Sequence, residues 1–210
     1  NATYYIGGKN KTVVIQTNTD FGNARFIVDD TSVKNGGANI FEVRSQLKPI
    51  KLKGISSLKR TQHKIDVALP QSSIITVDNS KVKRYIRYGS NRNNGSSQTD
   101  VFIVDRDGNV DMAAPIIWDF DQVTRITAQP MDDVTLTITG GRFTTIAKTA
   151  ESKFPYYARG IAIRRSNVVV DGLEHRITGE GDHGAPYGGF INIAGCANVT
   201  IRNTALTGHR

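Results

Sequence analysis

Short runs of β-branched and aromatic residues, each bounded by turn residues, cover most of the chain. Up to residue 121 they read TVVIQT, ARFIVDD, NIFEVRS, SIITVDN, DVFIVD and APIIWDFD; beyond it they read VTLTITG, GIAIRRS, NVVVDGL, FINIAG and NVTIRN. Such runs between turns are typical of β-strands. Apolar residues at the three-and-four spacing of an amphipathic helix are scarce,. The pattern predicts an all-β protein.

The strands of the second half recur at a nearly fixed interval. Gly140 of LTITGG aligns with Gly172 of VVVDGL at an offset of 32, and Asn167 aligns with Asn198 at an offset of 31. An upstream strand recurs as well, in GIAIRRSNVVV and GFINIAGCANVTI, which start at residues 160 and 189. A unit of about 30 residues is too short to bury its apolar face alone, so it must stack on its neighbours. Short strands, turns and no crossover helix predict a β-helical solenoid.

Two of these units have a more specific resemblance. GIAIRRSNVVVDGLEHRITG and GFINIAGCANVTIRNTALTG resemble coils of the right-handed parallel β-helix of the pectin-lyase-like superfamily. The shared phrase is a Gly-Ile strand, a turn, and then Asn-Val-x-Ile-x-Gly/Asn-Leu, and it covers roughly residues 132–210. The resemblance implies this fold and proteins that act on or bind polysaccharides, among them lyases, glycoside hydrolases, esterases, tailspikes and adhesins. A shared fold does not choose among these activities.

We expect one β-helix domain over residues 1–210. Residues 1–125 would form the N-terminal cap and irregular coils with inserted loops such as 87–100, and residues 126–210 the regular coils. VFIVDRDGNVDM predicts a hairpin with Asp107 and Gly108 at its turn,. The last residues, NVTIRNTALTGHR, read as a unit in progress, so we expect the native polypeptide to continue past Arg210.

The charge of the chain indicates a polyanionic partner. Its net charge is +8 and its isoelectric point is about 9.7, with the densest basic clusters at residues 48–60 and 81–87,. The sequence has no zinc finger, RNA-binding aromatic motif or basic helix, which leaves acidic polysaccharide ahead of nucleic acid. No run of apolar residues is long enough for a membrane helix,. A single cysteine, Cys196, excludes an intrachain disulfide. We expect a secreted or surface protein.

The stretch EHRITGEGDHGAPYGG, residues 174–189, holds most of the candidate chemistry. Long loops on one side of a parallel β-helix form a groove, so we place the site in this stretch. Asp182 and Glu180 are the candidate general acid and base for glycosidic cleavage. His183 is the candidate base for proton abstraction beside a uronate carboxylate. The alternative is a structural loop whose Asp and His side chains make local turn hydrogen bonds.

Substrate contacts are expected from the same stretch and from the next coil. Arg176 suits a bidentate clamp on a sugar carboxylate, and Tyr187 suits a platform for a sugar ring. ITGEGDH aligns with LTGHR at an offset of 29, which places His209 one coil along from Glu180. The expected substrate-binding residues are Arg176, His175, Tyr187, His209 and Arg210.

A second candidate site lies in IIWDFDQV, residues 116–123. On a strand, Asp119 and Asp121 would share one face about 7 Å apart, within the range of inverting glycosidases. The alternative is an ordinary strand with its acidic face in water. Hydrolases of the superfamily show Asn-x-Asp followed by a paired Asp-Asp, and neither phrase appears here in that context, because the Asp-Asp pairs at residues 29–30 and 132–133 lie in apparent turns. DRDGNVD departs from a calcium loop, so no metal ligand is assigned; we expect no cofactor, with calcium left open.

These observations favour a protein that binds and cleaves an acidic polysaccharide, with elimination and hydrolysis both open. The alternative is a non-catalytic β-helix, such as an adhesin, a tailspike-like fibre or a carbohydrate-recognition scaffold. A third interpretation is a fragment whose catalytic coils lie beyond Arg210. The sequence does not determine the sugar or the oligomeric state.

Overall fold

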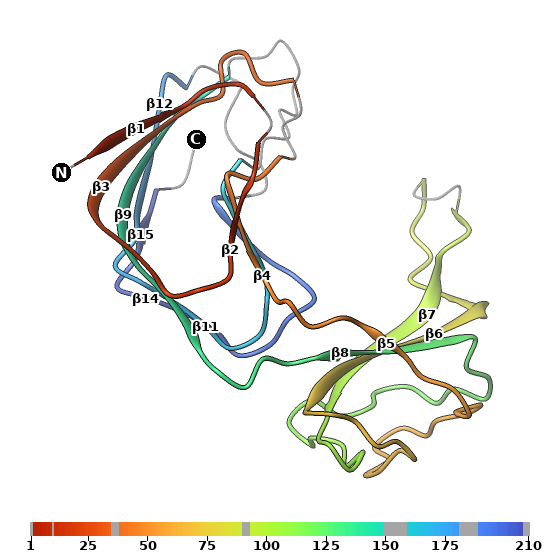
Figure 1. Ribbon diagram of the computed structural model, residues 1–210. Coiled ribbons are helices and arrows are strands. Elements are labelled where there is room, and N and C mark those ends of the chain that lie inside the picture. Colours follow the sequence, from red (N-terminus) through yellow and green to blue (C-terminus); the bar gives the residue numbers. More distant parts are fainter. Residues whose placement is uncertain are drawn as a thin grey trace. The chain divides into compact units, whose positions relative to one another are not determined.

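The computed structural model describes residues 2–9, 11–34, 38–89, 93–148, 159–180 and 189–207. The chain divides into two compact units (Figure 1). We call Asn1–Gln46 together with Val134–Arg210 the β-helix unit, and Leu47–Asp133 the inserted unit. The inserted unit enters after the second coil of the β-helix unit, and the chain then returns to build the remaining coils.

Two parallel sheets form the walls of the β-helix unit. The first has the order β1 (Thr3–Ile6), β3 (Thr19–Asp29), β9 (Leu136–Ile146), β11 (Val168–Asp171) and β14 (Val199–Arg202). Long β9 also pairs with β12 (Glu174–Thr178), which in turn pairs with β15 (Ala205–Leu206). The second sheet has the order β13 (Ile191–Ile193), β10 (Ile161–Arg164), β4 (Phe41–Arg44) and β2 (Val13–Ile15). Because the chain alternates between these sheets and every pair is parallel, the predicted right-handed parallel β-helix is confirmed.

The observed register explains the repeat in the sequence. Val168 pairs with Leu136 and with Val199, which gives the predicted offsets of 32 and 31. Asn167 and Asn198 both have positive φ, 58° and 57°, and the Asn198 amide donates to Oδ1 of Asn167 at 3.0 Å. Asparagine tolerates this conformation better than most residues, so it recurs at the same turn of successive coils.

Inward-facing side chains of successive coils stack to form the core of this unit. On the first sheet, Phe26 lies on Phe143 with ring centroids 4.6 Å apart and an interplanar angle of 10°. Phe41 of the second sheet meets both rings edge-on. The strands alternate between these buried positions and outward positions,. The inward side chains of the β-helix unit therefore form its apolar core. The outer face of the first sheet leaves polar side chains free to point into solvent.

The inserted unit has a different architecture, which the sequence analysis did not predict. Its strands are β5 (Ile50–Lys51), β8 (Arg125–Pro130), β6 (Ser73–Arg84) and β7 (Ser96–Val104), in that sheet order and all antiparallel. It has its own core, which includes Ile75, Phe102 and Phe120. The expectation of irregular β-helical coils throughout residues 1–125 was therefore wrong: residues 3–44 supply two coils, and the described part of residues 47–133 supplies none.

Two local predictions in the inserted unit had different outcomes. The hairpin turn at Asp107 and Gly108 is confirmed: Gly108 has φ of 80°, and Val104 pairs with Val110 across it. Oδ1 of Asp105 accepts the backbone N–H groups of Asp107 and Asn109. The run APIIWDFD does not form a strand, and its one ladder contact is an isolated bridge from Phe120 to Leu58.

Candidate functional site

The outer face of the first sheet carries arginines on neighbouring strands. Arg25 on β3 pairs with Arg142 on β9, which pairs with Glu174 on β12. Two residues further along, the next outward row contains Ile27, Thr144 and Arg176. Adjacent strands lie about 4.8 Å apart and outward residues about 6.7 Å apart along a strand. The three guanidinium groups therefore belong to one small area of the sheet surface.

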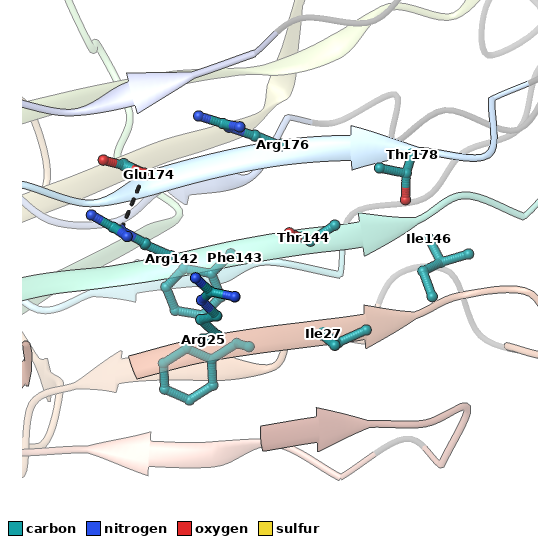
Figure 2. A pocket seen from close by; sticks show the side chains of 10 residues that line it. Arg25, Ile27, Arg142, Phe143, Thr144, Ile146, Glu174, Arg176 and Thr178 are labelled. Atoms are coloured by element: carbon teal, nitrogen blue, oxygen red, sulfur yellow. Dashed lines mark ion pairs between the residues drawn. The ribbon is translucent and has the colours of Figure 1, made fainter. Parts of the chain in front are cut away.

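This area is hollowed into a pocket of about 490 Å³ (Figure 2). β3, β9 and β12 provide all the residues that line it: Arg25, Phe26, Ile27, Arg142, Phe143, Thr144, Ile146, Glu174, Arg176 and Thr178. The arginines and Glu174 stand at one end, and Ile146 and Thr178 at the other (Figure 2). Polar groups around a partly apolar floor suit a ligand that has both charged and apolar surface.

The pocket has an excess of positive charge. Nε of Arg142 lies 3.5 Å from Oε2 of Glu174, with the two side chains 52% and 42% exposed. Arg25 and Arg176 are exposed, and neither has an ion pair or a side-chain hydrogen bond with the residues that the structure describes. Glu174 is the one carboxylate among the described residues of the lining. Two guanidinium groups therefore remain available to an anionic ligand.

Another carboxylate, Asp29, lies on the outer face but is committed to protein partners. It pairs with Ile146 at the end of β3. The hydroxyl of Tyr5 donates to its Oδ2 at 2.6 Å, and Thr31 donates to its Oδ1 through both its hydroxyl and its backbone N–H. These hydrogen bonds, those of Thr31 foremost, lower the pKa of Asp29. Asp29 is thus held as a carboxylate, and it also holds the exposed ring of Tyr5 beside the second outward row.

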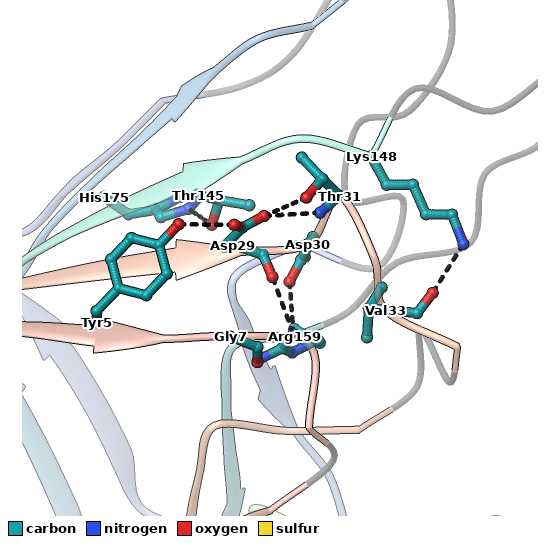
Figure 3. A network of polar contacts seen from close by, with 10 residues as sticks. All are labelled: Tyr5, Gly7, Asp29, Asp30, Thr31, Val33, Thr145, Lys148, Arg159 and His175. Carbon is teal, nitrogen blue, oxygen red and sulfur yellow. Dashed lines mark hydrogen bonds and ion pairs between the residues drawn. The ribbon is translucent and has the colours of Figure 1, made fainter.

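A buried polar network lies just beyond the ends of β1 and β3 (Figure 3). Arg159 and Asp30 form an ion pair at 3.0 Å, and each side chain is 2% exposed. Arg159 also donates to the carbonyl oxygen of Gly7 at 2.9 Å. Burial raises the pKa of Asp30 to about 6, and the charge of Arg159 opposes this shift. Because these groups are enclosed, the network joins the first two coils to the third rather than contacting a ligand.

The predicted site residues have different positions in this structure. Arg176 lies in the pocket, as its proposed role requires. His175 points inward: it is 2% exposed, stacks on Phe190 at 4.0 Å, and shares a hydrogen bond with Thr145 at 2.9 Å. Burial lowers the pKa of His175 to about 4. Alternation along β12 puts neighbouring residues on opposite faces, so His175 belongs to the core and not to a substrate-binding surface.

The remaining residues of the predicted loop are only partly described. Residues 174–178 form β12 rather than the loop that the sequence suggested. Glu180 is half-buried beyond its end. Asp182, His183, Tyr187, His209 and Arg210 lie outside the described residues. The pairing of His175 with Leu206 corresponds to an offset of 31. The offset of 29, which aligned Ile177 with Leu206, was therefore wrong in this strand, and the predicted place of His209 beside Glu180 lies outside the described residues.

Asp119 and Asp121 belong to the inserted unit, and both are exposed. Oδ1 of Asp119 accepts the backbone N–H of Arg60 at 2.9 Å, and Asp121 forms an ion pair with Lys59 at 3.3 Å. Phe120 between them is buried, so the predicted alternation holds although the segment is not a strand. Each carboxylate thus has a local partner, and neither lines the pocket.

Arg25, Arg142 and Glu174 were missed by the sequence analysis. The repeat contained a signal for them: ARFIVDD and GRFTTIA share an Arg-Phe pair, and these pairs are in register on β3 and β9. The same alignment by Gly140 and Gly172 places Arg142 beside Glu174. The recurrence was obscured because the whole inserted unit, Leu47–Asp133, separates β4 and β9 from one another.

The described residues contain no group of three or more His, Cys, Asp or Glu side chains that could hold a metal ion. In the same parts of the chain, no helix has both the length and the apolar character needed to cross a membrane.

Solved structures similar to this chain include three phage tailspikes. The tailspike gp61 of Pseudomonas phage phi297 is 10% identical, with a TM-score of 0.51 over 96% of this chain and 37% of that chain. The tailspike gp49 of Pseudomonas phage LKA1 is 14% identical, with a TM-score of 0.36 over 97% and 41%. The gp54 tailspike of Acinetobacter baumannii bacteriophage AP22, in complex with a capsular saccharide, is 10% identical, with a TM-score of 0.33 over 97% and 41%.

No family model and no curated protein matches the chain. The chain spans about two fifths of the length of the tailspikes. At 10% identity, the likeness to the phi297 tailspike concerns the fold, which it supports independently of the sequence repeat,.

Proposed function

We propose that the β-helix unit binds an anionic polysaccharide in the pocket on β3, β9 and β12. The observation that carries this proposal is the set of three arginines on neighbouring strands, two of which have no carboxylate partner among the described residues. A guanidinium presents paired N–H donors that match a carboxylate or a sulfate, and it stays charged at any physiological pH. Acidic groups of a sugar chain supply this chemistry.

The shape of the site supports a polymer rather than a small anion. The pocket extends across three strands, and the outward side chains continue in rows from coil to coil. Tyr5 extends the second row, with 64% of its surface exposed. Its ring offers a flat apolar face beside the charged groups, as sugar rings require. The resemblance of the fold to a phage tailspike agrees with a place outside the cell or on a virion, which we propose for this chain.

We further propose that cleavage takes place at the end of β12. Thr178 lines the pocket, Glu180 follows two residues later, and Asp182 and His183 come next in the sequence. Glu180 and Asp182 would serve hydrolysis as general acid and base. His183 would serve elimination by abstracting the proton beside a uronate carboxylate that Arg176 holds. Membership of the pectin-lyase-like superfamily is part of the same proposal.

Recognition without cleavage is the second candidate function. One observation favours it: the described lining contains a single carboxylate, and Glu174 is paired with Arg142. A glycosidase that uses two carboxyl groups would have to take both from residues beyond this lining. On this alternative, the pocket alone accounts for the function of the unit.

The binding proposal is tested by affinity electrophoresis and calorimetry with polygalacturonate, alginate, hyaluronate and heparin. The double variant R25A/R176A should weaken binding about 10-fold or more, because it removes two charge-assisted contacts. E174Q should strengthen binding about 2-fold to 5-fold, because it frees Arg142 and removes a repelling charge. R106A, which removes an exposed arginine paired with Asp133 in the inserted unit, is the control and should bind as the wild type does. Unchanged binding by R25A/R176A would refute the pocket as the site.

Cleavage is tested on the polysaccharide that binds. New reducing ends together with absorbance of unsaturated uronate would indicate elimination, and reducing ends alone would indicate hydrolysis. H183A should abolish elimination and D182N should abolish hydrolysis, and each variant should still bind the polysaccharide. If the wild-type protein binds the polymer and yields neither signal, recognition without cleavage is the function.

A further inference from the structure

The inserted unit has a hairpin that extends beyond its core (Figure 1). Along β6 and β7, Asn79 pairs with Gln98 and both are buried, but the next pair is Lys83 with Ser97. Residues 80–82 thus form a bulge on one strand only, which re-aims the hairpin. We call residues 80–89 and 93–97 the basic hairpin. Its side chains are mostly exposed, so its sequence is not explained by the packing of the core.

The basic hairpin has charges of one sign. Lys81, Lys83, Arg84 and Arg87 are exposed, and the sequence has no Asp or Glu from residue 79 to residue 99. Lys83 donates to the hydroxyl of Ser97 at 3.3 Å, and the guanidinium of Arg84 lies 4.8 Å from the centre of the Trp118 ring. None of the four has an ion pair within the described part of the chain. Their field remains uncompensated locally, so it favours an anionic partner.

The same hairpin exposes large apolar side chains. Tyr85 is 67%, Ile86 66% and Tyr88 94% exposed. Scattered exposed apolar residues need no explanation, but three within four positions on a projecting element are typical of a contact surface. Tyrosine in particular supplies a large rigid face with a polar end, at a low cost in side-chain entropy. The backbone of Tyr85 has φ of 51°, which turns the chain at this point.

We propose that the basic hairpin is a second contact surface for the anionic polysaccharide, which makes the chain a two-site binder of one polymer. Tyr85 and Tyr88 would lie against sugar rings, while Lys81, Lys83 and Arg87 would meet its acidic groups. This inference rests on the proposed function of the β-helix unit. An anionic membrane surface would meet the same charges and aromatic rings, and the vesicle measurement below decides between the two partners.

Two sites on one polymer have a measurable consequence. A polymer long enough to reach both sites would occupy both, so that the second contact becomes intramolecular and raises the apparent affinity. A short oligosaccharide fills one site and gains nothing from the other. The basic hairpin should therefore contribute to binding of the polymer and not to binding of its short fragments in the arginine pocket.

The test compares the polymer that binds in the screen above with its tetrasaccharide, on the full chain. Y85A/Y88A and K81Q/R87Q should each weaken polymer binding about 10-fold, while tetrasaccharide affinity changes less than about 2-fold. K51Q/K53Q removes two exposed lysines of the same unit outside the hairpin and is the matched charge control. The substituted residues of the hairpin are exposed, so the substitutions should leave the core intact, and circular dichroism of each variant checks this.

The possible failures can be distinguished. If the wild-type chain binds no acidic polysaccharide, the proposed function fails and this inference fails with it. If the polymer binds and the hairpin variants bind it as the wild type does, only the inference is overturned. Phosphatidylserine vesicles and single-stranded DNA are the comparison probes: a hairpin-dependent affinity for either that exceeds that for the polymer would assign the hairpin to a different partner.

Discussion

At the scale of single residues, neighbours in the sequence take opposite roles because of strand alternation. His175 and Arg176 are adjacent, yet the first is 2% exposed and the second lines the pocket. Arg159 and Arg25 have the same charge, but Arg159 precedes β10 and is enclosed with Asp30, while Arg25 faces outward from β3. Residue type alone thus indicated which side chains are polar. Their positions in the fold decided whether they stabilise the core or face a ligand.

The buried histidine gives a prediction for the pH dependence of stability. The pKa of His175 is about 4 in the folded chain, below its ordinary value of 6.5, because burial disfavours the charged ring. The unfolded chain therefore binds a proton that the folded chain does not, as pH falls below about 6.5. Proton binding by His175 in the unfolded chain should therefore lower the free energy of unfolding as pH falls from about 6.5 to 4, by about 3 kcal/mol in all. Urea unfolding of the wild type and of H175F at several pH values measures this.

The comparison with H175F isolates the histidine from other groups. The pKa of Asp30 is raised to about 6, so its contribution has the opposite sign and fades as pH rises through that value,. Asp30 is present in both proteins, and its effect cancels in their difference. H175F keeps the aromatic stack on Phe190 and loses the contact with Thr145, which gives a constant offset above pH 7. Parallel stability curves for the two proteins from pH 7 to pH 4 would contradict the assignment.

At the scale of the element, the β-helix unit depends on turns that let coils approach closely. Gly160 precedes β10, and a Cβ on it would collide with the carbonyl oxygen of Phe190 in the next coil. The same carbonyl oxygen accepts the backbone N–H of Ile161 at 2.8 Å. The contact between these two coils is therefore made by backbone against backbone, and no side chain fits between them.

This contact predicts a large effect of one methyl group. G160A should lower the free energy of unfolding by about 2 kcal/mol or more, because the coils must separate to admit it. G7A is the matched control: a methyl group on Gly7 would meet no described atom within 4 Å, and Gly7 has no positive φ, so the variant should be as stable as the wild type. Thermal and urea unfolding of both variants measure the difference. Equal stability of G160A and G7A would contradict the observed close approach.

Much of the β-helix at this scale was predictable from the sequence, for a physical reason. Parallel coils put equivalent residues one above the other, so positive φ and core positions repeat, as in Asn167 with Asn198 and Val168 with Val199. The exact offset between coils was harder to predict. Ile161 pairs with Ile191, an offset of 30 residues, whereas the sequence alignment had matched Gly160 with Gly189 at an offset of 29. Of the three arginines in the pocket, Arg176 alone was predicted, because Arg25 and Arg142 become neighbours only when distant strands pair.

At the scale of the whole molecule, the division into two units was not predictable from local pattern. SIITVDN and DVFIVD have the same alternation as the strands of the coils, and alternation does not distinguish parallel from antiparallel pairing,. The sequence also has no Pro- or Gly-rich linker at residues 46–47 or 133–134. The separate core around Ile75, Phe102 and Phe120 is what defines the inserted unit, and it exists only once the chain is folded.

Two separate cores predict two separable unfolding transitions. The single tryptophan, Trp118, packs against the core of the inserted unit, so its fluorescence reports that unit alone, while far-UV circular dichroism reports both. F102A removes a fully buried side chain from one core and F143A a side chain that is 1% exposed from the other. Each should cost about 3–5 kcal/mol in its own unit.

F102A should therefore shift the fluorescence transition to lower urea concentration. F143A should leave the fluorescence transition unchanged and should shift part of the circular dichroism transition. This follows because a cavity destabilises the cooperative unit that contains it and leaves an independent unit unaffected. If both variants moved both signals by the same amount, the two units would unfold as one cooperative body, and the inserted unit would contribute to the stability of the coils that carry the arginine pocket. Separate shifts would instead mean that the inserted unit can be altered without loss of that pocket, so that the two proposed polysaccharide contacts can be varied one at a time.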